Sequence, residues 1–219
     1  MKHFLVLSAL LQHPEQALID ALPELDDVLR AHSPELQETI APLLKHLNET
    51  DLITLQEQYV MTFDRSRSHS LHLFEHVYGE SRDRGPAMVS LMEEYTARGY
   101  FIAADEIPDY LPMFLEFLSL LSPEEANDFL GEAIHVPAKI GATLAESNNP
   151  YAYVFEALLT LTDVAPLPLA EPPVSDMDEL LETFGPGADG TEPLLKPKHG
   201  NAQPINFYAP GATPAMCNQ

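Results

Sequence analysis

The chain has 219 residues, 45% of them apolar, which is enough for one sizeable hydrophobic core. Thirty-four Asp and Glu against eleven Lys and Arg give a formal net charge of −23, which opposes binding to nucleic acid or to an anionic membrane because both require basic residues. A single Cys, Cys217, excludes an internal disulfide and is compatible with a reducing compartment.

The first part of the chain has helical apolar spacing almost throughout. Residues 4–11 are an apolar run of about the minimum length for a signal peptide, but no small-residue cleavage site follows, so we expect a short first helix. Residues 15–30 and 35–47 place Leu and Ile at intervals of three and four, which is typical of amphipathic helices.

Two further helices are predicted around the middle of the chain. Asp51 is placed to cap the first of them, which carries Leu55, Tyr59 and Phe63 on one face. The second has an apolar stripe at Met88, Leu91, Met92 and Tyr95. Gly and Pro separate these segments, and no segment alternates long enough to predict a strand. We therefore expect an all-α bundle.

The composition changes near residue 163. Residues 163–219 hold ten of the twenty Pro and five of the ten Gly, and they lack an apolar period apart from one short helix predicted near residues 177–184. We expect an all-helical domain over residues 1–165 and a Pro-rich, acidic and largely disordered tail over residues 166–219.

The few basic residues are concentrated, since five of the eleven lie within residues 65–98. His69, His72 and His76 lie among them at spacings that let all three share one helix face, as metal ligands can. Glu80 could add an oxygen ligand. The alternative is that the His residues occupy the polar side of an ordinary helix. A metal-dependent enzyme using these three His residues is therefore one hypothesis, although no motif of a self-sufficient active site accompanies them.

Arg82 and Arg84 follow in a segment bracketed by Gly79 and Gly85. Their planar guanidinium groups can bind carboxylates, phosphates or carbonyl oxygens in two-pronged fashion. Two interpretations are open: the arginines hold neighbouring helix ends and acidic side chains, or they bind a partner.

A second segment, residues 105–118, combines an acidic loop with a very apolar helix. If Asp109 is the helix N-cap, Pro112 falls at the third helical position, where no intrahelical partner is lost. Tyr110, Phe114 and Phe117 form a stripe that is either core or the lining of a groove for an amphipathic peptide helix. Met88, Met92 and Met113 would suit such an adaptable groove.

Residues 71–85, supported by residues 106–112, resemble the NarJ family of nitrate reductase delta subunits, within the TorD/DmsD superfamily of redox-enzyme maturation chaperones. The second segment is similar to the superfamily's Glu-x-Pro-Asp-His loop, with Tyr110 in place of His. The resemblance covers about residues 1–165 and implies a single helical bundle domain of the TorD-like type.

The resemblance also implies a function. Such proteins are cytoplasmic chaperones rather than enzymes. They bind the apo catalytic (alpha) subunit of respiratory nitrate reductase, chiefly at its N-terminus, and keep it competent for insertion of molybdenum cofactor and an iron–sulfur cluster before membrane docking. Molybdenum cofactor biosynthesis proteins are further expected partners. No cofactor of the chain's own, no nucleic acid and no direct membrane insertion are expected.

A strongly acidic all-α chain suits a basic client helix, and we expect client contacts from both similar segments. Phe114, Phe117, Met88 and Met92 are expected to line the groove, and Glu106, Asp109 and Glu116 to meet client Lys or Arg. The full expected set is His72, Phe74, Glu75, His76, Glu80, Arg82, Arg84, Met88, Met92, Glu106, Pro108, Asp109, Tyr110, Phe114, Glu116 and Phe117. The remaining alternative is an acidic scaffold protein with no role in cofactor loading.

Overall fold

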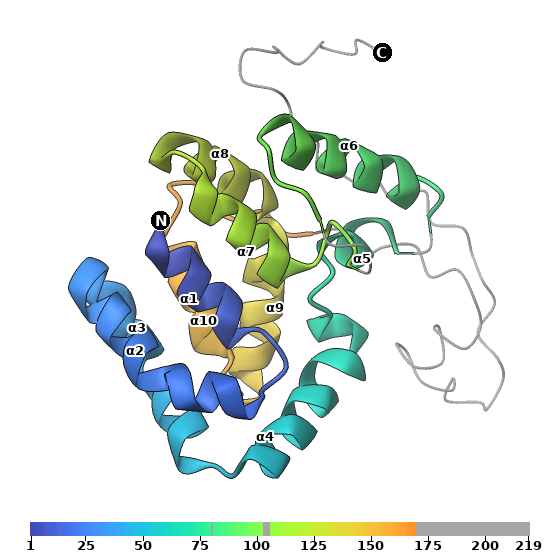
Figure 1. Cartoon of the computed structure of the whole chain (residues 1–219). Helices are drawn as coiled ribbons and strands as arrows, with labels where there is room; N and C mark the ends of the chain where they lie inside the picture. Colours follow the sequence, from blue (N-terminus) through green and yellow to red (C-terminus); the bar gives the residue numbers. More distant parts are fainter. Residues whose placement is uncertain (80, 103–105, 170–219) are drawn as a thin grey trace, which may run out of the picture.

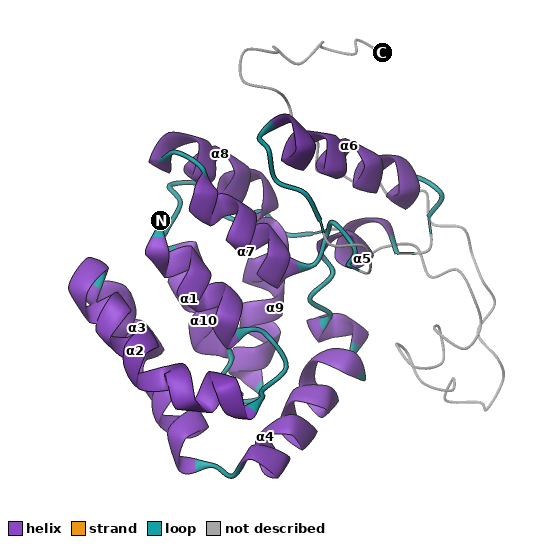
Figure 2. Ribbon diagram, viewed as in Figure 1, coloured by secondary structure: helices purple, strands orange, loops and turns teal. Residues whose placement is uncertain are grey.

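The structure is a computed structural model that describes residues 1–79, 81–102 and 106–169. The predicted helix near residues 177–184 and Cys217 lie outside the described residues, as does Glu80. Across the described ranges the chain is helical, with no extended strand, which confirms the all-α prediction (Figures 1 and 2).

The elements follow one another through short connections. In chain order they are α1 (Lys2–Leu10), α2 (Gln16–His32), α3 (Pro34–Glu49), α4 (Leu52–Tyr59), the π-helical turn η1 (Val60–Asp64), the 3-10 turn η2 (Arg67–His69), α5 (Leu73–Tyr78), α6 (Arg84–Ala97), α7 (Leu111–Leu120), α8 (Pro123–Ala133), α9 (His135–Glu146) and α10 (Ala152–Leu159).

The core lies between helices that are distant in sequence. α1 packs along α7, α10 packs against both α9 and α3, and α2 pairs with α3 at one side (Figure 1). Phe4 and Leu7 of α1 are buried there, together with Phe155 of α10. The apolar run at residues 4–11 therefore forms a core helix, as expected. α4 and α6 stand at the edges of the bundle (Figure 1).

Local sequence signals account for several helix ends. The Asp51 carboxylate accepts a hydrogen bond of 3.0 Å from the Thr54 amide, so the predicted cap of α4 is confirmed. Pro34 begins α3, where its missing N–H costs nothing. Ser122 and Glu125 form a reciprocal capping box at the start of α8.

Gly141 of α9 allows the close approach of α10. A Cβ atom at this position would lie 2.6 Å from the Cβ of Phe155, so only Gly fits without separating the two helices. Among the described residues, no helix combines the length and the apolar character needed to cross a bilayer.

Candidate functional site

The two similar segments fold onto each other. His72 and Tyr110 form an isolated antiparallel bridge, in which the Leu111 amide donates to the Leu71 carbonyl at 2.8 Å. The Leu73 amide donates to the Asp109 carbonyl at 3.0 Å. The start of α5 and the start of α7 are therefore joined by backbone hydrogen bonds across nearly forty residues.

The Asp109 side chain, which has no exposed surface, is the centre of this junction. One carboxylate oxygen accepts a hydrogen bond of 3.0 Å from the Phe74 amide, in the first turn of α5. The same oxygen lies 3.7 Å from Nη2 of Arg84, and the other lies 3.4 Å from Nδ1 of His72. A buried carboxylate is stable only when paired and hydrogen-bonded, and Asp109 has both kinds of partner.

Arg84 and Glu75 complete what we call the Asp109 cluster, which consists of His72, Glu75, Arg84 and Asp109. Nη2 of Arg84 also lies 3.3 Å from Oε1 of Glu75, so one guanidinium bridges two carboxylates. Of the two interpretations open for Arg84, the structure therefore supports the first, in which the arginine holds acidic side chains of its own chain. The hydrogen bond to Asp109 raises the pKa of His72 above its ordinary value, although burial opposes this shift.

A second tie fixes the same loop. The buried Tyr95 hydroxyl of α6 donates to the Pro108 carbonyl at 2.8 Å, next to Asp109. Burial raises the pKa of Tyr95 far above its ordinary value, so the hydroxyl keeps its proton and remains a donor. The loop before α7 is thus attached to α5 through Asp109 and to α6 through Pro108.

The predicted role of Asp109 as the N-cap of α7 is wrong. Tyr110 occupies the N-cap position, and Pro112 is the second residue of the helix rather than the third. The reason is that the Asp109 carboxylate turns away from its own helix and accepts from the first turn of α5 instead. Asp109 therefore caps a helix that precedes it by 35 residues in sequence.

The three His residues, whose spacing allowed a shared helix face, do not share one. His69 lies in η2, His72 precedes α5, and only His76 lies within α5. Each ring contacts a different oxygen: His69 the Thr62 carbonyl, His72 the Asp109 carboxylate, and His76 the Ser70 carbonyl. In the described ranges no three His, Cys, Asp or Glu side chains are arranged to hold a metal ion, so this geometry gives no support to the metal-site hypothesis.

The expected groove lining is divided between core and surface. Phe114 and Phe117 have no exposed surface, because the stripe that carries them faces the core, where Phe117 packs against Tyr95 and Phe129. Met113 is buried beside them. This corrects the prediction that the two Phe side chains line a groove. Met88 is half-buried, whereas Met92 is exposed on α6.

The remaining expected residues are placed as follows. Phe74, His76 and Pro108 are buried. Glu116 is half-buried and accepts hydrogen bonds from Ser8, Gln12 and Tyr100, so it is already engaged within the bundle. Arg82 and Glu106 are exposed, and Tyr110 is half-buried. Asp109, fully buried and paired, does not face solvent, which corrects the expectation that it meets client Lys or Arg.

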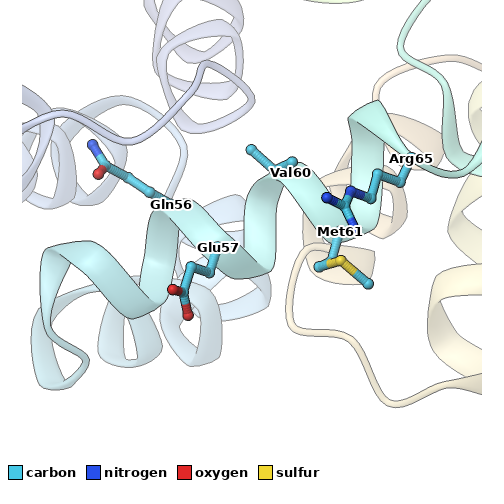
Figure 3. Close-up of a pocket in the computed structure, with 5 residues that line it drawn as sticks. All are labelled: Gln56, Glu57, Val60, Met61 and Arg65. Atoms are coloured by element: carbon cyan, nitrogen blue, oxygen red, sulfur yellow. The ribbon is translucent and has the colours of Figure 1, made fainter.

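Sequence reasoning missed an apolar surface on α4 and η1. We call Ile53, Gln56, Glu57, Val60 and Met61 the α4–η1 face. All except Ile53 line, with Arg65, an open pocket of about 430 Å³ (Figure 3). Ile53 lies one helical turn before Glu57 in α4. The signal was present in the sequence, because Ile53, Val60 and Met61 fall outside the buried stripe of the same helix.

The chain is similar in sequence to known proteins of one family. The profile of the family described as nitrate reductase delta subunit matches residues 22–157. Over 95% of this chain, the sequence is 32% identical to the nitrate reductase molybdenum cofactor assembly chaperone NarJ of Escherichia coli K12, covering 86% of that protein. The chain belongs to the nitrate reductase delta subunit family.

Two other members show how far the similarity extends. The probable chaperone NarW of Escherichia coli K12 is 36% identical over 71% of this chain and 66% of its own length. The probable chaperone NarJ of Bacillus subtilis is 28% identical over 71% of this chain and 85% of its own length. The part of this chain matched by the delta subunit profile contains both the Asp109 cluster and the α4–η1 face.

Proposed function

We propose that this chain is a system-specific chaperone of respiratory nitrate reductase. It binds the apo catalytic subunit, chiefly at its N-terminal segment, and keeps it competent for insertion of molybdenum cofactor and an iron–sulfur cluster before membrane docking. The observation that carries the proposal is the similarity over 95% of the chain to a relative named as a molybdenum cofactor assembly chaperone. The chain acts in the cytoplasm, without catalysis of its own, and molybdenum cofactor biosynthesis proteins are further partners.

The geometry suggests how the expected site residues divide their work. Asp109, Phe74, His76, Pro108, Phe114 and Phe117 are buried and hold the junction of α5, α6 and α7. Arg82, Met92 and Glu106 are exposed and remain the proposed client contacts of this region. A rigid junction that presents exposed side chains on loops is a usual way to build a recognition surface.

The test compares cells with and without the gene for this chain. The catalytic subunit is captured from each, and its molybdenum and iron contents are measured together with nitrate reductase activity. The proposal requires that the subunit copurify with this chain and that both metal contents fall when the chain is absent. A second molybdenum enzyme in the same cells is the control and should keep its molybdenum.

Two results would contradict the proposal. Normal molybdenum and iron in the subunit from cells lacking the chain, with only assembly reduced, would favour the acidic scaffold. If the subunit does not copurify with the chain, whether or not it carries its metals, it is not the client of this chain.

A further inference from the structure

We propose that the outward side of α6 is a self-association surface, on which a second copy of this chain packs antiparallel about a twofold axis at Val89. The interface needs no client and therefore goes beyond the proposed function. We call this surface the α6 outer face, which consists of Arg82, Gly85, Pro86, Val89, Met92, Glu93 and Thr96.

One side of α6 is fixed to the bundle, and the opposite side is exposed. Leu91 and Tyr95 have no exposed surface, and Arg98 pairs with Glu94 on the same inner side. At 3.6 residues per turn, the members of the α6 outer face that lie within the helix fall within about 60° of Val89. Each of them is exposed, and α6 stands at the edge of the bundle (Figure 1).

The centre of the α6 outer face is apolar and can be approached closely. Val89 is 52% exposed and Met92 is 45% exposed, although both belong to a regular helix. Pro86 is exposed one turn before Val89, and nothing lies within 4 Å of a methyl group added at Gly85. Small residues of this kind let two helix axes approach to about 8 Å.

An antiparallel copy matches this row residue by residue. About a twofold axis, a residue that precedes Val89 in one copy meets the residue that follows Val89 by the same number in the other. Val89 then meets its own counterpart, and Pro86 of each copy meets Met92 of the other. The apolar residues therefore cover one another in both halves of the contact.

Charge self-complementarity identifies the occupant. The chain's net charge of −23 opposes self-association, so a face used by two copies must be close to neutral. The α6 outer face meets this condition, because it carries one base, Arg82, and one acid, Glu93. In the antiparallel arrangement Glu93 lies opposite Gly85, only ~4.5 Å along the helix from Arg82 at ~1.5 Å per residue. A long Arg side chain spans that offset, and the symmetry forms the ion pair twice.

The size of the contact sets its strength. α6 has 14 residues and is therefore about 21 Å long at ~1.5 Å per residue. One helix from each copy buries less than the ~1,200 Å² at which stable interfaces begin. We expect a reversible dimer with a Kd of about 10–100 µM.

The dimer has a consequence that rests on the proposed function. Arg82 and Met92 belong to the α6 outer face and are also proposed client contacts. A second copy and the client therefore exclude each other at these two residues. Added apo catalytic subunit should convert the dimer into a complex that contains one copy of this chain.

The first experiment is sedimentation equilibrium of the full-length chain over a range of concentrations. Val89→Glu places two carboxylates against each other at the twofold axis and should raise the dimer Kd by at least about tenfold. Ile53→Glu is the matched control, because Ile53 is 69% exposed on α4, which lies far from α6 (Figure 1). It should leave the dimer Kd within about twofold.

A charge exchange tests the antiparallel register. Arg82→Glu and Glu93→Arg should each raise the dimer Kd by at least about threefold, because each turns two opposite-charge pairs into like-charge pairs. The double variant should return to within about twofold of the wild type. Glu38→Arg on α3 makes the same change in net charge as Glu93→Arg and should not weaken the dimer. Circular dichroism and thermal melting confirm that every variant is folded.

The outcomes separate this interface from the proposed function. A wild type that stays monomeric at about 1 mM, well above the expected Kd, overturns the interface, and so does a double variant that does not regain the dimer. If Val89→Glu leaves sedimentation unchanged but lowers capture of the apo subunit, the α6 outer face belongs to the client and the inference is overturned. If the subunit binds without dissociating the dimer, the exclusion is wrong while the interface stands. If the subunit does not bind at all, the proposed function fails and the interface is unaffected.

Discussion

At the scale of single residues, Asp109 has the largest influence on the described structure. Its carboxylate accepts from an amide of α5 and lies close to the Arg84 and His72 side chains, and its own carbonyl accepts from the Leu73 amide. One residue thereby fixes the relative positions of α5, α6 and the loop that leads into α7. Because the carboxylate has no exposed surface, water does not replace the contacts that a shorter side chain would lose.

Asp109→Ala is expected to lower the free energy of unfolding by about 3 kcal/mol, the usual effect of removing one partner from a buried ion pair. Urea denaturation followed by circular dichroism measures the change. Asp163→Ala is the control: Asp163 is exposed, and its substitution should stay within about 0.5 kcal/mol. Equal effects of the two substitutions would show that Asp109 is not a structural centre.

The raised pKa of His72 predicts how the stability of the fold changes with pH. Its pKa in the folded state is raised above the ordinary 6.5, chiefly by the hydrogen bond with Asp109, so its protonated form stabilises the fold. The stability difference between wild type and His72→Gln should be fully present below pH 6.5 and should disappear as the pH rises through the folded-state pKa.

Histidine NMR titration of the wild type checks the same point directly. His72 should titrate above 6.5, whereas His76, whose pKa is lowered by burial, should titrate below it. The reverse order would contradict the assignment of the His72–Asp109 contact.

At the scale of elements, the contact between α9 and α10 depends on a missing side chain. Gly141→Ala should destabilise the fold by about 1–3 kcal/mol, because the new methyl group meets the Cβ of Phe155, which has no room to move. Gly85→Ala in the first turn of α6 is the matched test, since nothing lies within 4 Å of its added methyl group. That substitution should be neutral or stabilise by up to about 1 kcal/mol, through helix propensity and loss of backbone freedom in the unfolded chain.

Chemical denaturation of both variants distinguishes packing from propensity. If the two substitutions shift stability in the same direction and by the same amount, local propensity would account for both, and close packing of α9 on α10 would not be required.

Local signals predicted the elements well, and long-range contacts explain where prediction failed. Helices around α2, α3 and α4 follow from apolar spacing, and Asp51 is recognisable as a cap because the Thr54 amide that donates to it lies only three residues ahead. Asp109 has the same side chain before an even more apolar helix, but its carboxylate binds the distant amide of Phe74 instead. No residue close to Asp109 in the sequence indicates that its carboxylate will accept from the Phe74 amide. The groove predicted from Phe114 and Phe117 failed similarly, because that stripe is buried in the core, where Phe117 packs against Tyr95 of α6 and Phe129 of α8.

At the scale of the whole molecule, the basic cluster seen in the sequence does not form one positive surface. Arg84 is used within the Asp109 cluster, and Arg98 pairs with Glu94 and lies over the Phe129 ring at 4.8 Å. Arg65, just after η1, and Arg82, in the turn before α6, are exposed. The long-range field of the chain is therefore set by its acidic excess, which favours encounter with basic segments and weakens with added salt.

The predicted division of the chain into a helical domain and a tail leads to a test by truncation. The described core is built by residues up to Leu158, and Leu161 and Leu169 pack against its surface. A chain ending at residue 169 should therefore keep its helical signal per residue and a melting temperature within about 4 °C of the full chain, a shift that corresponds to roughly 1 kcal/mol. Truncation at residue 150, which removes α10 from the core, is the control and should abolish cooperative melting.

The π turn at η1 has an evolutionary consequence. Its ring closes from Arg65 to Val60 and so holds one residue more than an α-helical turn, while Tyr59 just before it and Phe63 within it still face the core. Loss of a single codon within residues 60–62 would restore an α-helical turn and leave the inner face in phase. Such a one-residue gap in a homologue would mark a lineage that kept the fold and changed the outward surface where Met61 now stands.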